Sequence, residues 1–230
     1  MPIGRALSLA LQQLPDPAFR RTLLLGIGLS LLVFGGLAAL IVVGIHYVPA
    51  TRWHWLDDLV AVGGAVGFLI AMWLLFPAVV SLFIGLLLDD VAEAVERRYY
   101  AHDPPGRAPS FLQATLSSLK LMIVLVVLNI LVLPLYVVAL FVPFLSLGIF
   151  LVLNGYLLGR EYFELVAIRH LTPRDAGALR RYWRGRVFLA GIVIAGLFAV
   201  PVVNLLAPII GAAFMMHVFK GLLTKPSAVK

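Results

Sequence analysis

The sequence has no cysteine and few charged residues. Of its 230 residues, 13% are charged and 62% are apolar, whereas a soluble domain carries about 25% charged and about 45–50% apolar residues. The lack of cysteine excludes disulfide scaffolds, thiolate catalysis, iron–sulfur clusters and zinc fingers. The apolar excess excludes an intrinsically disordered chain and indicates an integral membrane protein.

Motifs of familiar enzymes are also missing. The sequence contains no glycine-rich phosphate loop, no G-x-S-x-G nucleophile elbow and no H-E-x-x-H metal motif. We therefore predict a protein that is not an enzyme, with no catalytic residues, no metal and no cofactor. The net charge is +7, but the basic residues flank apolar runs, which favours contact with membrane lipids and predicts no nucleic-acid binding.

Two long apolar segments are predicted to be membrane helices. Residues 17–48 and 59–88 each exceed the roughly 20 residues that a membrane span needs. Asp16 is expected to cap the first helix, with Pro17 at its first position. The second helix is expected to leave the membrane and continue to about residue 101.

Prolines interrupt the two remaining apolar runs. No uninterrupted piece of either run reaches the roughly 20 residues of a span, which predicts helical hairpins with a turn inside the membrane. The interrupting pairs are Pro134 and Pro143 in the uncharged run 121–159, which lies in the predicted hairpin 110–159, and Pro201 and Pro208 in the predicted hairpin 187–219.

The distribution of basic residues supports this topology. If two segments cross and both hairpins return, all but one of the 18 Lys and Arg lie on one side, and only Arg52 lies on the other. The positive-inside rule then places both termini in the cytoplasm. We predict an all-α integral membrane protein that forms a single membrane domain, residues 1–230. It has two transmembrane helices and two proline-broken hairpins, which we favour as partly penetrating.

Two polar segments complete the predicted architecture. Residues 1–16 carry apolar side chains at helical spacing, which favours a helix lying in the membrane interface over an ordinary cytosolic lead-in. Residues 160–186 are predicted to form cytoplasmic helices, the second of them basic and close to the lipid headgroups. Thr172 and Asp175 form a capping box at the start of that second helix.

Arg20 and Arg21 are the first candidates for a binding site. They lie in the opening turns of the first predicted span, where backbone N–H groups are free and the helix dipole attracts anions. Two guanidinium groups there would suit a tetrahedral oxyanion. The alternative is that both arginines anchor the helix among lipid headgroups, and Asp16 could neutralise one of them.

Two asparagines lie within apolar segments. Asn204 lies between two prolines at the predicted tip of the second hairpin, where its amide could line a polar pathway or cap the broken backbone. Asn154 allows the same two interpretations.

Glu161 and Glu164 lie near the end of an apolar run and are further candidates for a polar pathway. A pair of carboxylates with His170 nearby also suggests acid–base or metal chemistry. The spacing of Arg160 and Glu164, however, favours a structural ion pair along one helix face.

Two runs resemble signature sequences of the CysZ sulfate transporters. They are Leu153–Ala167 (LNGYLLGREYFELVA) and Pro201–Ala213 (PVVNLLAPIIGAA), and the resemblance extends over the whole chain. It implies bacterial inner-membrane proteins that take up sulfate for assimilation into cysteine, within a family that includes the etoposide-induced membrane proteins of eukaryotes. It also implies two spanning helices, two partly penetrating hairpins and a homo-oligomer.

The resemblance includes a short element before the first span. CysZ proteins are similar to one another in a Pro-Gly-hydrophobic-Arg-Arg element linked to sulfate, which here reads Pro17-Ala18-Phe19-Arg20-Arg21. Both arginines are kept, and Ala18 replaces the glycine. The resemblance therefore implies a sulfate site at Ala18, Phe19, Arg20 and Arg21.

We predict channel-like uptake of sulfate without ATP across the bacterial inner membrane, with sulfite and similar oxyanions as related substrates. No acidic residue lies inside an apolar run, where it would favour proton coupling. The alternative is a membrane scaffold or regulatory subunit that does not transport. A third hypothesis is an enzyme acting on lipid headgroups through Glu161, Glu164 and His170.

Overall fold

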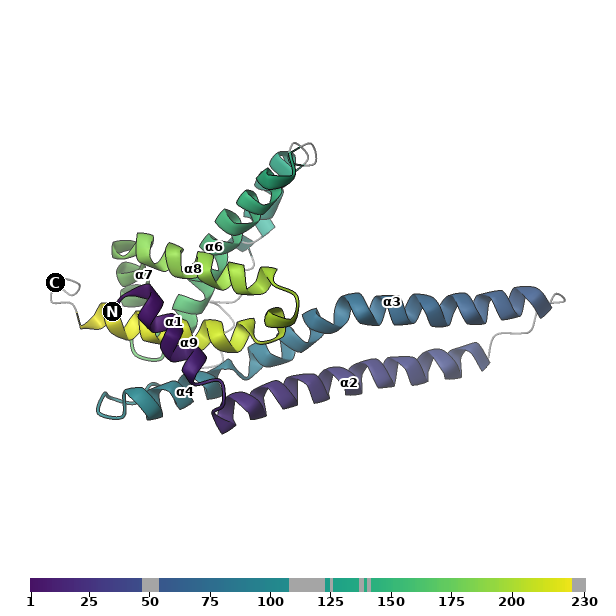
Figure 1. Ribbon diagram of the computed structural model, residues 1–230, viewed down its shortest axis with the longest axis horizontal. Helices are drawn as coiled ribbons and strands as arrows, with labels where there is room; N and C mark the ends of the chain where they lie inside the picture. Colours follow the sequence, from purple (N-terminus) through teal and green to yellow (C-terminus); the bar gives the residue numbers. More distant parts are fainter. Residues whose placement is uncertain (47–53, 108–122, 125, 137–138, 140–141, 225–230) are drawn as a thin grey trace.

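The computed structural model describes residues 1–46, 54–107, 123–124, 126–136, 139 and 142–224. Within those residues the regular secondary structure is entirely helical, which confirms the predicted all-α class (Figure 1). Arg52 and residues 110–122 of the first predicted hairpin lie outside the described residues. The elements are α1 (Ile3–Gln12), α2 (Pro17–His46), α3 (His54–Leu86), α4 (Leu88–Tyr99), the helix Val126–Tyr136, α6 (Pro143–Ala167), α7 (Pro173–Tyr182), α8 (Arg184–Ala199), the 3-10 turn η1 (Val202–Leu205) and α9 (Ala207–Leu223).

Helices α2 and α3 form a long antiparallel arm that extends away from the other helices (Figure 1). Their segments Pro17–Gly44 and Ala61–Leu86 are long and apolar enough to cross a membrane. Large apolar side chains cover the outside of the arm, among them Leu32 at 73% exposure and Trp73 at 77%. Such a surface is stable against lipid or another protein rather than water, which agrees with two predicted spans.

Helix α6 also contains a segment, Phe144–Ala167, that is long and apolar enough to cross a membrane. The sequence pattern predicts a boundary between residues 159 and 160, but α6 runs without a break from Pro143 to Ala167. Pro143 occupies the first turn, where its missing N–H costs nothing. The Arg160 Nε donates to Glu164 Oε1 at 3.1 Å across one turn, so charged residues continue the helix instead of ending it. Among the described residues, three helices are therefore long and apolar enough to cross a membrane, or four if the bent pair α7 and α8 is counted as one span.

The second predicted hairpin consists of α8, η1 and α9. Helix α8 ends at Ala199, just before Pro201, and α9 begins at Ala207 with Pro208 in its first turn. Both prolines thus lie at helix ends, where the ring does not break an established hydrogen bond. The tip contacts α3 and reaches only part of the way along the α2–α3 arm (Figure 1).

Helix α9 forms the centre of the helical body. Every residue from Ala207 to Lys220 is buried, with α1, α4, α6 and α8 packed around it. Helix α1 turns Ala6 and Ala10 towards α9 with no exposed surface, and Arg186 on α8 donates to the Met1 carbonyl oxygen. The predicted interfacial helix therefore packs on the protein, and its contact with lipid stays a prediction.

Helices α6 and α8 pack with their backbones in contact. A Cβ atom on Gly191 of α8 would overlap the carbonyl oxygen of Gly155. A Cβ atom on Gly159 would lie 2.6 Å from the Val187 carbonyl oxygen. Small residues at helix interfaces allow this close approach in membranes. These three glycines therefore serve packing.

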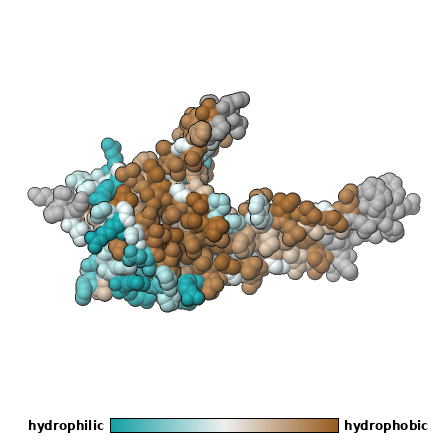
Figure 2. All heavy atoms as spheres, in the orientation of Figure 1, coloured by the Kyte–Doolittle hydropathy of each residue, from teal (hydrophilic) through white to brown (hydrophobic). Residues whose placement is uncertain are grey.

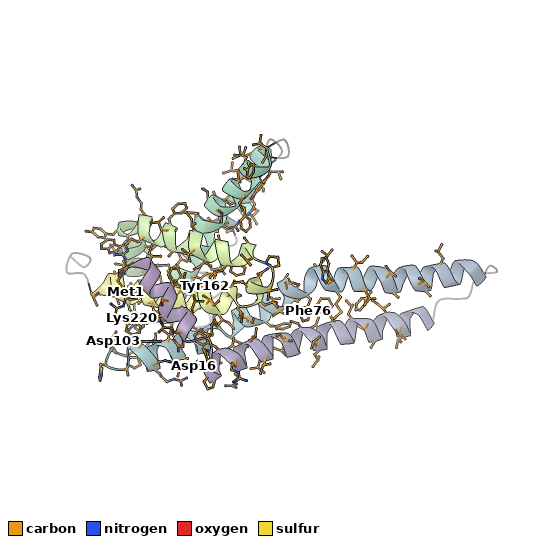
Figure 3. The ribbon with its side chains drawn as sticks, viewed as in Figure 1. Met1, Asp16, Phe76, Asp103, Tyr162 and Lys220 are labelled. Atoms are coloured by element: carbon orange, nitrogen blue, oxygen red, sulfur yellow. The ribbon has the colours of Figure 1, made fainter. Side chains whose placement is uncertain are left out.

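Polar residues gather at one end of the molecule. Figure 2 shows hydrophilic residues over α4 and α7, while the α2–α3 arm and the α8–α9 hairpin are mostly apolar. Within this polar end, Lys220 Nζ on α9 lies 2.9 Å from Asp103 Oδ2, after α4 (Figure 3). The separation of polar from apolar residues indicates that one end of the molecule faces water, and the predicted topology makes this the cytoplasmic face.

The depth of the second hairpin can be tested with single cysteines, because the chain has none of its own. Val202 at the tip is 83% exposed, so a Val202→Cys thiol would face whatever surrounds the tip. We expect a membrane-impermeant maleimide to leave this thiol unlabelled from both sides in intact membranes, because an impermeant reagent does not reach a thiol within the hydrocarbon. Ala101→Cys, at the polar end, is expected to react from the cytoplasmic side.

Labelling in dodecyl sulfate provides the control that both thiols are reactive. Reaction of Val202→Cys from outside intact cells would show that the hairpin crosses the membrane and would contradict partial penetration.

Candidate functional site

The start of α2 is organised by a helix cap. The Asp16 Oδ1 accepts a hydrogen bond of 3.0 Å from the Ala18 N–H, and Pro17 is the first helical residue. This confirms the cap expected from the sequence. An Asp side chain at this position satisfies an N–H group that has no partner within the helix. The Ala18 N–H, one of the predicted sulfate contacts, is therefore already engaged by a carboxylate.

Arg20 and Arg21 follow the cap and are both exposed. Within the part of the chain that the structure describes, neither forms an ion pair. Arg21 lines a small cavity of about 170 Å³ together with Asp90 and Glu93 of α4. These carboxylates compete with an incoming anion for the Arg21 guanidinium, whereas Arg20 has no such neighbour in that cavity.

Phe19 takes a different place from the two arginines. Its side chain is 2% exposed and belongs to the main hydrophobic core. The sequence Phe19-Arg20-Arg21 therefore directs one side chain inward and two outward. Packing of Phe19 holds the first turn of α2 against the body, and the two guanidinium groups remain the binding elements of the predicted site.

The two asparagines differ in their hydrogen bonding. The Asn154 Nδ2 donates to the Phe150 carbonyl oxygen at 2.9 Å, one turn earlier in α6. Asn204 lies in η1 at the hairpin tip and is half-buried. Among the described residues its side chain has no hydrogen-bond partner, so its amide is free for a ligand or water. Asn204 is thus the better placed of the two for a polar pathway.

The side chains of Glu161 and Glu164 differ in their exposure and in their partners. Glu161 is exposed on α6. Glu164 is half-buried, and its Oε1 lies 3.1 Å from Arg160 Nε and 3.7 Å from Arg180 Nε. The structural ion pair expected from the sequence is therefore present, and it extends to α7.

The acid–base group of the third hypothesis is not assembled. His170 Nε2 lies 2.8 Å from Glu96 Oε1, so His170 pairs with α4 instead of with Glu161 and Glu164. In the described part of the chain, no three His, Asp or Glu side chains are grouped so that they could hold a metal ion.

The polar end holds a buried ionic cluster that the sequence pattern does not predict. We call it the Glu96 cluster: Glu96, Arg169, His170 and Asp89. The Arg169 side chain is 4% exposed, and its Nη1 lies 3.0 Å from Asp89 Oδ1 and its Nη2 3.4 Å from Glu96 Oε2. The partners are far apart in the sequence, and no local spacing indicates the pairing.

The Glu96 cluster shifts the ionisation of its central carboxyl. Burial acts to raise the pKa of Glu96, but hydrogen bonds from His170 and Arg169 and the positive charges of both residues lower it to about 2. These favourable contacts outweigh desolvation, so Glu96 is charged at neutral pH. The cluster joins α4 to the segment between α6 and α7 and stabilises the polar end.

Comparison with known families gives one match. A family model described as Sulfate transporter CysZ/Etoposide-induced protein 2.4 matches residues 6–208. That range includes the start of α2, all of α6 and the tip of the α8–α9 hairpin. No curated protein matches the chain.

Proposed function

The chain belongs to the family of the sulfate transporter CysZ and etoposide-induced protein 2.4, and we propose that it carries sulfate across the bacterial inner membrane to supply cysteine synthesis. A transporter-type role in a membrane follows from the family and from the apolar helices. In the proposal the protein needs no ATP and acts like a channel.

The observation that best supports an anionic substrate is the exposure of Arg20 and Arg21 at the polar end of α2. They lie in the first two turns of a helix, where the macrodipole adds positive potential. A sulfate dianion would gain charge-assisted hydrogen bonds from both guanidinium groups. The proposed role of the pair is to collect sulfate at the membrane surface on the cytoplasmic side.

The proposed route continues along the broken hairpin. Asn204 offers a free amide at a turn between two prolines, and irregular backbone at membrane depth is stable where it is buried or lines a water-filled path. The α2–α3 arm exposes a large apolar surface, part of which several copies of the chain would cover by assembling. We therefore include a homo-oligomer in the proposal.

The direct test is uptake of radiolabelled sulfate by liposomes that hold the purified protein. We expect uptake driven by a sulfate gradient alone, without ATP and without a proton gradient, and competition by sulfite. Liposomes without protein give the background. Uptake that requires a proton gradient would contradict the channel-like mechanism. Absence of uptake by correctly assembled protein would favour the membrane scaffold or regulatory subunit.

A further inference from the structure

A second basic site lies away from the start of α2, where α6, α7 and α8 meet. A cavity of about 520 Å³ opens there, and four of its lining residues are arginines. They are Arg160 on α6, Arg180 and Arg181 on α7, and Arg184 at the first position of α8. Four positive charges this close together repel one another, and this repulsion destabilises the packing of α6, α7 and α8 unless anions neutralise it.

The protein supplies only part of that balance. Glu164 is the one carboxylate paired with these arginines among the described residues, and it is shared by Arg160 and Arg180. Arg160 has a side chain that is 7% exposed, and Arg180 has a buried Nε without a hydrogen-bond partner. Arg181 and Arg184 form no ion pair in the described part of the chain. A buried guanidinium without a full set of partners is costly, so the cavity favours an anion.

The beginning of α8 adds to this preference. The first turn of α8 contains no acidic residue. Arg184 lies at the positive end of the helix dipole, where a cation is unfavourable by itself. An anion in the cavity would satisfy both the dipole and the arginine.

The cavity continues into an apolar groove. A neighbouring cavity of about 560 Å³ lies between the helix Val126–Tyr136, α6 and the first turns of α8, and its lining is apolar. Tyr156 and Phe188 line both cavities. An anionic group and a long apolar chain would therefore fit side by side, which is the shape of a phospholipid and not of a free ion.

We propose that this combined site binds an anionic phospholipid, with the headgroup phosphate held by Arg160, Arg180, Arg181 and Arg184 and an acyl chain in the groove. Guanidinium groups bind phosphate through paired, charge-assisted hydrogen bonds. The lipid would join α6, α7 and α8 at the membrane boundary. This site is separate from Arg20 and Arg21, and the proposal is independent of sulfate transport.

The test is native mass spectrometry of the full chain in detergent, titrated with dioleoylphosphatidylglycerol, dioleoylphosphatidylcholine or inorganic phosphate. We expect tight binding of one phosphatidylglycerol per copy and weaker binding of phosphatidylcholine. Arg181→Gln/Arg184→Gln removes two exposed guanidinium groups without breaking an ion pair, and we expect it to weaken phosphatidylglycerol binding about tenfold or more. Arg5→Gln/Arg174→Gln is the matched control, because both arginines are exposed and neither lines the cavity.

A second variant separates a lipid from a free oxyanion. A Cβ at Gly148 in the groove meets nothing within 4 Å, so the backbone there accepts a side chain, and Gly148→Phe would place a ring in the groove. We expect it to weaken phosphatidylglycerol binding while the arginines remain in place. Equal loss in the arginine variant and its control, or equal binding of both lipids, would overturn the proposal. Phosphate binding as tight as lipid binding, unaffected by Gly148→Phe, would show a free-oxyanion site instead.

Discussion

Sulfate uptake is expected to fall about tenfold or more when Arg20 and Arg21 are both replaced by glutamine. Each charge-assisted hydrogen bond to an anion contributes roughly 1.5–3 kcal/mol, and about 1.4 kcal/mol corresponds to a factor of ten in binding. Both side chains are exposed, so the loss of folding stability should be small. The measurement is the initial rate of radiolabelled sulfate uptake in liposomes at sulfate concentrations below saturation.

Two further variants make this result specific. Arg5→Gln/Arg174→Gln removes the same charge from exposed positions elsewhere and is expected to keep normal uptake. Arg20→Lys/Arg21→Lys keeps the charge but loses the paired geometry of guanidinium, so an intermediate rate is expected. Normal uptake by the glutamine variant would instead show that the two arginines anchor α2 at the headgroups.

Replacing Glu96 with glutamine is expected to lower the free energy of unfolding by about 3 kcal/mol at neutral pH, because the buried Arg169 then loses its charged partner. The same estimate follows from the pKa, which falls from 4.5 to about 2, at about 1.4 kcal/mol per pKa unit. Since the folded state holds the lower pKa, this contribution is complete above pH 4.5 and is lost as the pH falls towards 2.

Chemical unfolding in detergent micelles, followed by tryptophan fluorescence between pH 7 and pH 2, measures both effects. Glu93→Gln is the matched control on the same helix, because Glu93 forms an exposed pair with Arg97 and such pairs contribute little. We expect the stability difference between the Glu96 variant and the wild type to shrink below pH 4.5. A difference that stays constant with pH would show that Glu96 acts through packing and not through its charge.

Local chemistry made several elements predictable. Asp16 and Thr172 each accept a backbone hydrogen bond at the start of a helix, and the residues that follow allow such caps to be recognised from sequence. Pro201 and Pro208 mark the ends of α8 and α9 because proline cannot continue an established helix. The pair Arg20 and Arg21 is exposed, and its binding of sulfate, which the resemblance implies, stays a prediction.

Long-range contacts account for what could not be predicted. The pairing of Glu96 with Arg169 depends on how α4 packs beside α9 and meets the segment that follows α6, and neither residue has a distinctive local pattern. The interruption predicted at Pro143 is confirmed, since α6 starts there, whereas Pro134 lies within the helix Val126–Tyr136. The predicted boundary at Arg160 is wrong, because its pair with Glu164 continues α6. Phe19 lies in a sequence that resembles a binding motif, but its side chain is part of the hydrophobic core.

The glycine contact between α6 and α8 also restricts how the protein can move. Sliding α8 by one turn, about 5.4 Å, would place Val187 or Ala195 where only Gly191 fits against Gly155. Each of these residues carries a Cβ atom that would collide with the α6 backbone. The two helices therefore share a single register and move as one unit, so a movement of α9 or α7 relative to them would rotate about the turn at Pro201 or the 91° bend between α7 and α8.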